Sequence, residues 1–125
     1  MSSNINFINS PELGTPKLPL CHAASAGGLT FLSGQFAISP DTGKVVGKTL
    51  ETQAGQVFDN ITATLKTIGK DYSDVVECTV YLRDMKDFPE INGIYQTYFK
   101  APYPARTTVA VGGLPLDVLI EAGLI

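Results

Sequence analysis

The stretch VVECTVYL, residues 75–82, alternates apolar and polar side chains in the way a half-buried β-strand does. Every second residue from Val76 to Leu82 is apolar, with Cys78 among them, whereas Glu77 and Thr79 occupy positions in between. Successive side chains of a strand point to opposite faces of its sheet. The stretch therefore predicts a strand with one apolar face and one more polar face.

The segment before this strand predicts a long helix. Between Thr52 and Gly69 the apolar side chains recur at intervals of three and four residues, which is the spacing of one helix face. These apolar residues are Ala54, Val57, Phe58, Ile61, Leu65 and Ile68. Gly69 can adopt the left-handed conformation that commonly ends a helix.

A second helix is predicted to begin at DFPE, residues 87–90. Asp87 can cap the helix, Pro89 is tolerated in the first turn, and Glu90 matches the reciprocal half of a capping box. The expected apolar face consists of Phe88, Ile91, Tyr95, Tyr98 and Phe99.

Further strands are expected at both ends of the chain. LTFLSGQ, residues 29–35, leads into a turn-forming SPDTGK, and ARTTVAV and DVLIEAGLI follow the second helix with a turn near Pro115. This order predicts an α+β fold, formed as one domain over residues 1–125, with helices covering one face of the sheet. The other face also carries apolar residues and would need cover, so a homo-oligomer is expected.

Composition and the absence of certain motifs argue against several classes of function. The net charge is −3 and the nine basic residues are scattered, so no nucleic-acid partner is expected. The apolar runs are too short for a membrane span, and the first residues resemble no targeting sequence, which favours a cytoplasmic protein. Cys21 and Cys78 are expected to be free packing residues there. No motif for a metal or nucleotide occurs, so neither a metal nor an organic cofactor is expected.

Arg106 follows two prolines in PYPARTTVAV, residues 102–111. A guanidinium keeps its charge at any working pH and can hold a carboxylate through two parallel hydrogen bonds. The stretch therefore indicates a clamp for an acidic ligand. The alternative is an internal ion pair with Asp117, Glu121 or another carboxylate, and residue types alone favour that alternative.

Three other positions could carry chemistry. Glu121 lies among apolar residues, where burial would raise its pKa and let it exchange protons with water, although a paired carboxylate at a strand edge is the simpler interpretation. Ser33 and Gly34 could offer a hydroxyl and an approachable backbone, or could simply end a strand. His22, the only histidine, and its neighbour Cys21 are interpreted as structural because adjacent strand residues face opposite ways.

Taken together, these segments resemble the Rid proteins, the reactive-intermediate deaminases also called YjgF-type or L-PSP proteins. The resemblance covers essentially the whole chain. It is carried by LTFLSGQ, PDTGKV, QVFDNI, VVECTVYLRDMKDF, INGIY, YPARTTVAV and LPLDVLIE. It implies a chorismate-mutase-like fold, in which a mixed sheet has two helices on one face. It also implies a homotrimer with a central β-barrel and ligand sites in the clefts between subunits.

The resemblance also implies roles for individual residues. Arg106 falls at the family's carboxylate-binding arginine, and Glu121 at its water-orienting glutamate. The other substrate-binding positions fall on Ser33, Gly34, Asn92, Thr108 and Leu20. Leu20 stands where many members carry a tyrosine, so the preferred substrate could be more apolar or turnover weaker.

The activity implied is hydrolysis of enamine or imine intermediates, such as 2-aminoacrylate, to 2-keto acids and ammonia, without a cofactor. A second activity attributed to this family is that of an L-PSP-type endoribonuclease or translation inhibitor. A third possibility is a non-catalytic trimer that binds small carboxylates.

Overall fold

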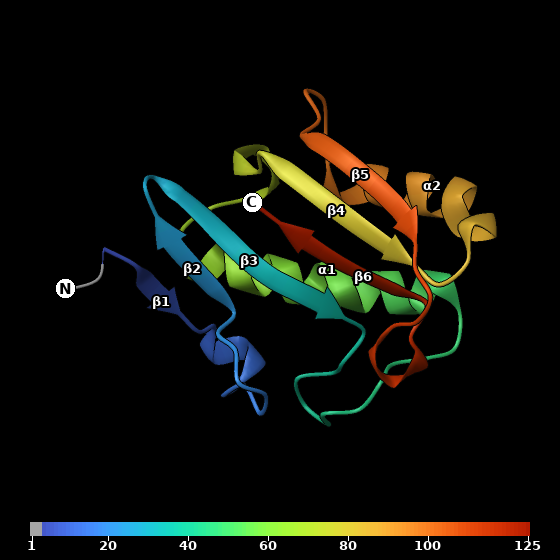
Figure 1. The fold of residues 1–125 in the computed structure, drawn as a ribbon, viewed down its shortest axis with the longest axis horizontal. Helices are drawn as coiled ribbons and strands as arrows, with labels where there is room; N and C mark the ends of the chain where they lie inside the picture. The colour runs from blue at the N-terminus through green and yellow to red at the C-terminus, as the bar shows by residue number, and fades with distance from the viewer. Residues whose placement is uncertain (1–3) are drawn as a thin grey trace.

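The chain forms one six-stranded sheet in the computed structural model, which describes residues 4–125 (Figure 1). Met1 to Ser3, which belong to the predicted domain and to the amino-terminal segment, lie outside the described residues. In sheet order the strands are β1 (Asn6–Ile8), β2 (Ala23–Ala26), β3 (Leu29–Phe36), β6 (Ile120–Leu124), β4 (Glu77–Leu82) and β5 (Ala105–Ala110). Only β4 and β5 pair in parallel; the other neighbours are antiparallel.

Two helices, α1 (Leu50–Thr67) and α2 (Phe88–Tyr98), cover one face of the sheet. Figure 1 shows both behind the strands, with α1 crossing behind β3 and β6 and α2 lying behind β5. The predicted α+β fold, with its mixed sheet and helices on one face, is confirmed. Within residues 4–125, no helix is long and apolar enough to cross a membrane.

Local sequence accounts for both ends of α1. The Thr49 hydroxyl accepts a hydrogen bond from the backbone N–H of Thr52 at 3.2 Å, which caps the first turn. At the other end Gly69 has a φ of 71°, as expected, and its N–H donates to the carbonyl of Lys66. The N–H of Lys70 donates to the carbonyl of Leu65, which completes a Schellman cap.

The start of α2 differs from the prediction. Asp87 makes no side-chain capping bond within residues 4–125, because it already has helical backbone angles as the last residue of a 3-10 turn, Met85–Asp87. The cap is Asp84, whose carboxylate accepts a hydrogen bond from the N–H of Lys86 at 2.9 Å. The helical path therefore begins one turn earlier than the sequence pattern indicates.

Every second side chain of β4 points into the hydrophobic core. Cys78, Val80 and Leu82 are fully buried beneath the helices, as predicted. Val76, which the pattern places on the same apolar face, is 56% exposed and lies just before the first residue of β4. From the helices, Phe58 packs against the rings of three aromatic residues on and after α2. These are Tyr95, Tyr98 and Phe99, with ring centroids 4.8–6.2 Å from that of Phe58.

The opposite face of the sheet carries no helix of its own. Glu77, Thr79 and Tyr81 on β4 and Glu121 on β6 point to this open face and are half-buried, and Phe31 on β3 is exposed. The expectation that one face lacks cover within a single chain is confirmed for the described residues.

Replacing Phe58 by alanine should lower the free energy of unfolding by about 3–5 kcal/mol, because it removes a fully buried ring that joins the two helices. Urea titration followed by circular dichroism would measure the loss. Phe7→Ala is the matched control, since that ring is 66% exposed, and it should cost under about 0.5 kcal/mol. Equal losses would contradict the assignment of the core.

Candidate functional site

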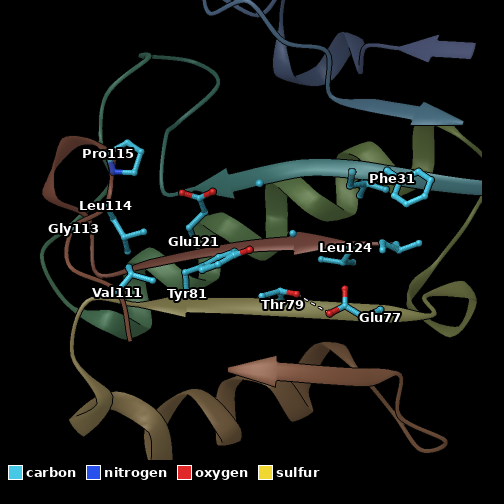
Figure 2. Close-up of a pocket in the computed structure, with 14 residues that line it drawn as sticks. Phe31, Glu77, Thr79, Tyr81, Val111, Gly113, Leu114, Pro115, Glu121 and Leu124 are labelled. Carbon is cyan, nitrogen blue, oxygen red and sulfur yellow. Dashed lines mark hydrogen bonds between the residues drawn. The ribbon is translucent and has the colours of Figure 1, made fainter. Parts of the chain in front are cut away.

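A cavity of about 480 Å³ lies on the open face of the sheet (Figure 2). Its walls are formed by β3, β4, β6 and the segment after β5. The lining residues are Phe31, Leu32, Gly34, Glu77, Thr79, Tyr81, Val111, Gly113, Leu114, Pro115, Glu121, Gly123, Leu124 and Ile125. Most are apolar or small, so a polar group on this wall has few polar neighbours.

Glu121 is the carboxylate that faces the cavity from β6. Figure 2 shows it beside Tyr81, its register partner on β4. Partial burial raises the pKa of the Glu121 carboxyl. Gly34 on β3 gives this carboxyl its space, because a Cβ at that position would collide with Glu121 Oε2. Sequence reasoning named both residues, and the structure brings them together.

Ser33 on β3 anchors the segment that leads into β2. Its hydroxyl donates to the carbonyl of Cys21 at 2.6 Å, and its N–H donates to the carbonyl of His22 at 3.0 Å. Leu20 precedes this anchored segment and is 46% exposed. The hydroxyl of Ser33 therefore holds the loop and retains only acceptor capacity for a ligand.

Arg106 lies on the other side of the sheet. It pairs in register with Cys78, and its guanidinium extends toward α2. Its Nε donates to Thr108 Oγ1 at 2.8 Å and its Nη2 donates to Asn92 Oδ1 at 2.6 Å. The structure thus brings together three of the residues that sequence reasoning assigned to substrate binding.

The internal ion pair favoured by residue types is wrong for Arg106. No carboxylate of residues 4–125 forms a salt bridge with it. Asp117, one of the candidate partners, instead binds Arg83 at 2.7 Å. Glu121, the other named candidate, projects from the opposite face of the sheet. The guanidinium therefore keeps its positive charge unbalanced within the described chain.

Two contacts between Arg106 and aromatic rings were not predicted from the sequence. Its guanidinium carbon lies 4.7 Å from the ring centre of Tyr95 and 5.6 Å from that of Phe88. Both rings were predicted only as part of the apolar face of the second helix. The available signal was spacing, since Phe88, Asn92 and Tyr95 stand at i, i+4 and i+7 on one helix face.

Arg106 and Glu121 do not converge within one chain. Register partners in a sheet point to the same face. Arg106 therefore points toward the helices, as its partner Cys78 does, and Glu121 points toward the open cavity, as its partner Tyr81 does. The single chain therefore carries two separate candidate half-sites. One is the Arg106 guanidinium with its neutral neighbours beside α2, and the other is the cavity with the Glu121 carboxyl on the open face.

His22 and the cysteines have structural surroundings. His22 is buried, and its Nδ1 accepts a hydrogen bond from the N–H of Ser10 at 2.8 Å, while burial lowers its pKa. Cys21 and Cys78 are free. In the part of the chain that the structure describes, no three His, Cys, Asp or Glu side chains gather as metal ligands.

A family model described as Endoribonuclease L-PSP matches residues 13–125. The chain belongs to the Rid/L-PSP family. A curated relative, Reactive Intermediate Deaminase A, chloroplastic, from Arabidopsis thaliana, is 47% identical over 97% of this chain and 67% of its own length. The family recognised from the sequence motifs is thereby confirmed.

Solved structures agree with this membership. The Rid-family protein YyfA from Yersinia pestis superposes with a TM-score of 0.91 at 33% identity, covering 96% of both chains. E. coli TdcF with bound serine superposes with a TM-score of 0.87 at 29% identity, covering 95% of both chains. The fold of the Rid/L-PSP family therefore extends over nearly all of the chain.

Glu121→Gln should raise the free energy of unfolding at neutral pH and leave it nearly unchanged in acid. Because the folded state raises the pKa of Glu121, the protein is most stable with this carboxyl protonated and loses stability as pH rises past the usual glutamate pKa. Glutamine mimics the protonated form at every pH. Urea unfolding of both proteins across this pH range would measure the difference, and a gap that narrows toward neutral pH would contradict the raised pKa.

Proposed function

We propose that this protein hydrolyses enamine and imine intermediates that carry a carboxylate, such as 2-aminoacrylate, to 2-keto acids and ammonia. The observation that carries the proposal is the guanidinium of Arg106, which neutral groups hold in place and no described carboxylate neutralises. The relative named as a reactive intermediate deaminase supports the same activity.

Arg106 is proposed to bind the carboxylate of the substrate. A guanidinium has five N–H donors, and hydrogen bonds to Thr108 and Asn92 engage two of its nitrogens. The remaining donors can meet both oxygens of a carboxylate in a charge-assisted contact worth about 1.5–3 kcal/mol. Bound this way, the cation also withdraws electron density from the adjacent C=N group.

Glu121 is proposed to handle the water. Its raised pKa makes it a stronger base than an ordinary glutamate, which suits a group that must accept a proton and then return it. An enamine such as 2-aminoacrylate first takes up a proton from water at its terminal carbon, which gives the iminium with its C=N bond. The oxygen of a second water molecule bonds to the iminium carbon while Glu121 takes one proton of that water, and the electron pair of the C=N π bond moves to the nitrogen, which becomes an amine. Glu121 returns the proton to this nitrogen, and the C–N bond breaks as the hydroxyl loses its own proton to Glu121 or water, which releases ammonia and leaves the keto group.

The two half-sites require a second copy of the chain. We propose the homotrimer with a central β-barrel, in which the open sheet faces cover one another and Arg106 of one subunit meets the Glu121 cavity of its neighbour. The apolar lining of the open face and the opposite orientations of the two residues support this assembly. Formation of a composite site would exclude bulk water from the reacting carbon.

The expected substrate is small. Leu20 offers an apolar side chain where many relatives carry a phenol, which favours imines with apolar side chains. The bound serine of E. coli TdcF is consistent with a pocket for small amino-acid-like carboxylates. Such intermediates already hydrolyse in water, so no metal or organic cofactor is proposed. The proposed compartment is the cytoplasm, although the Arabidopsis relative is named as chloroplastic.

The name of the family model keeps an endoribonuclease as the second candidate. RNA cleavage generally uses a pair of acid-base groups and cations for the phosphate. The only histidine is buried, and its Nδ1 is occupied by the N–H of Ser10. These observations favour the deaminase over the nuclease. A non-catalytic carboxylate-binding trimer would retain Arg106 binding without turnover.

Arg106→Ala should reduce the hydrolysis of 2-aminoacrylate at least about 10-fold, because it removes the charge-assisted contact with the carboxylate. The substrate can be generated by a serine dehydratase and the keto acid followed over time. Arg106→Lys should recover only part of the rate because an ammonium lacks the planar fork. Lys66→Ala, which removes an exposed charge from α1, is the charge-matched control and should retain full activity.

Equal rates for wild type and Arg106→Ala would refute the deaminase. The same preparations can be tested for RNA cleavage. An RNA-degrading activity that survives extensive purification and is independent of Arg106 would support the nuclease instead.

Gly34→Ala should lower the deaminase rate by at least about 10-fold, because the new methyl group displaces the Glu121 carboxyl from its place in the cavity. The keto-acid assay measures this loss. Gly55→Ala on α1, where a methyl group meets nothing within 4 Å, should keep the rate and slightly stabilise the helix. An unchanged rate in Gly34→Ala would remove Glu121 from the mechanism.

A further inference from the structure

All four side chains that hold the Arg106 guanidinium are electrically neutral. An amide oxygen and a hydroxyl accept its hydrogen bonds, and two aromatic rings lie within 5.6 Å of its central carbon. The residues are Asn92, Thr108, Tyr95 and Phe88. Partial charges and ring quadrupoles attract a cation without supplying a full counter-charge. The surroundings therefore fix the guanidinium and leave its net charge available.

Tyr95 is the most firmly fixed of these partners. It is only 3% exposed, and its ring stacks on Phe99 with centroids 4.2 Å apart and planes 13° from parallel. Phe99 and Tyr95 each meet Phe58 edge-on, so the ring belongs to the core that joins the two helices. Its position does not depend on Arg106. A ring held by the core can thus act as a rigid platform for the long side chain of Arg106.

The hydroxyl of Tyr95 contributes little to this platform. It is buried, and within residues 4–125 the polar group that it meets is the Cys78 thiol, which is a weak hydrogen-bond partner. A buried hydroxyl paired only with a thiol adds little stability, so a phenylalanine would serve the core about as well. The interaction with Arg106 resides in the ring, which is the part of the side chain that phenylalanine preserves.

We propose that Tyr95 is a positioning residue for the substrate-binding arginine, and that the neutrality of its companion Asn92 selects for an anionic ligand. This inference rests on the proposed function and adds two determinants to the same site. A carboxylate at residue 92 would orient Arg106 equally well but would neutralise it and compete with the substrate. The amide orients the cation while leaving its charge for the ligand.

The Tyr95 platform is tested by comparing Tyr95→Phe with Tyr95→Leu in the full-length protein. Leucine keeps an apolar side chain but removes the ring, so KM for the imine substrate should rise about 2- to 30-fold, the range expected from a lost cation–π contact. Phenylalanine should keep the wild-type KM, with an equal or higher Tm. Restoration by phenylalanine separates the ring's effect on Arg106 from general damage, and equal KM values in all three proteins would overturn the role of Tyr95.

The role of neutrality is tested with Asn92→Asp, which changes an amide oxygen into a carboxylate beside Arg106. The dissociation constant for 2-oxobutanoate, measured by isothermal titration calorimetry, should rise at least about 10-fold while Tm stays equal or increases. Gln96→Glu adds the same charge one turn further along α2, where the side chain is exposed, and should leave the dissociation constant unchanged. Opposite movements of affinity and Tm are not expected from a merely structural change.

The binding readout keeps this inference distinct from the proposed reaction. If wild type binds 2-oxobutanoate but hydrolyses no imine, the deaminase fails, and a weaker Asn92→Asp complex still supports selection by neutrality. If wild type hydrolyses imines and Asn92→Asp binds the keto acid as tightly as wild type, selection by neutrality fails alone. Absence of any carboxylate binding to wild type would overturn both.

Discussion

The two-residue period of the β-strand determines where the functional candidates lie, because each side chain of this sheet points either toward the helices or toward the open face. On β4 this period buries Cys78 and its alternate neighbours beneath α1 and α2 and turns Tyr81 outward. Through register pairing, the same rule sends Arg106 toward α2 and Glu121 toward the cavity. A single sheet thereby separates two charged groups that would otherwise neutralise each other.

This separation has an electrostatic consequence. A guanidinium beside a carboxylate would form an internal ion pair with little attraction left for a ligand. Arg106 instead contacts an amide, a hydroxyl and two rings, which hold its position without supplying a negative charge. Glu121 loses hydration in an apolar cavity without gaining a cation, so its pKa rises. Within residues 4–125, each candidate half-site therefore has a key group without an oppositely charged partner.

Local patterns were informative wherever neighbouring residues determine the structure. Three features were predictable because periodicity and cap chemistry operate over a few residues: α1 with Gly69 just beyond its end, the buried alternate residues of β4, and the strand carrying Arg106. The prediction failed at Asp87, where a preceding 3-10 turn moved the cap to Asp84. It also placed the start of β4 two residues too early, at Val75 rather than Glu77, which is the usual size of error for an element boundary.

The sequence by itself determined the family, the α+β class and the identity of the residues that could bind or react, because motifs and hydrophobic periodicity depend only on the order of residues along the chain. Only the tertiary structure decided which residues meet. The Tyr95 ring contacts the Arg106 guanidinium, and Asp117 forms a salt bridge with Arg83. The Glu121 carboxyl lies directly over Gly34. These contacts join segments up to 87 residues apart, as between Gly34 and Glu121, and depend on strand order and register, which side-chain patterns along one segment do not specify.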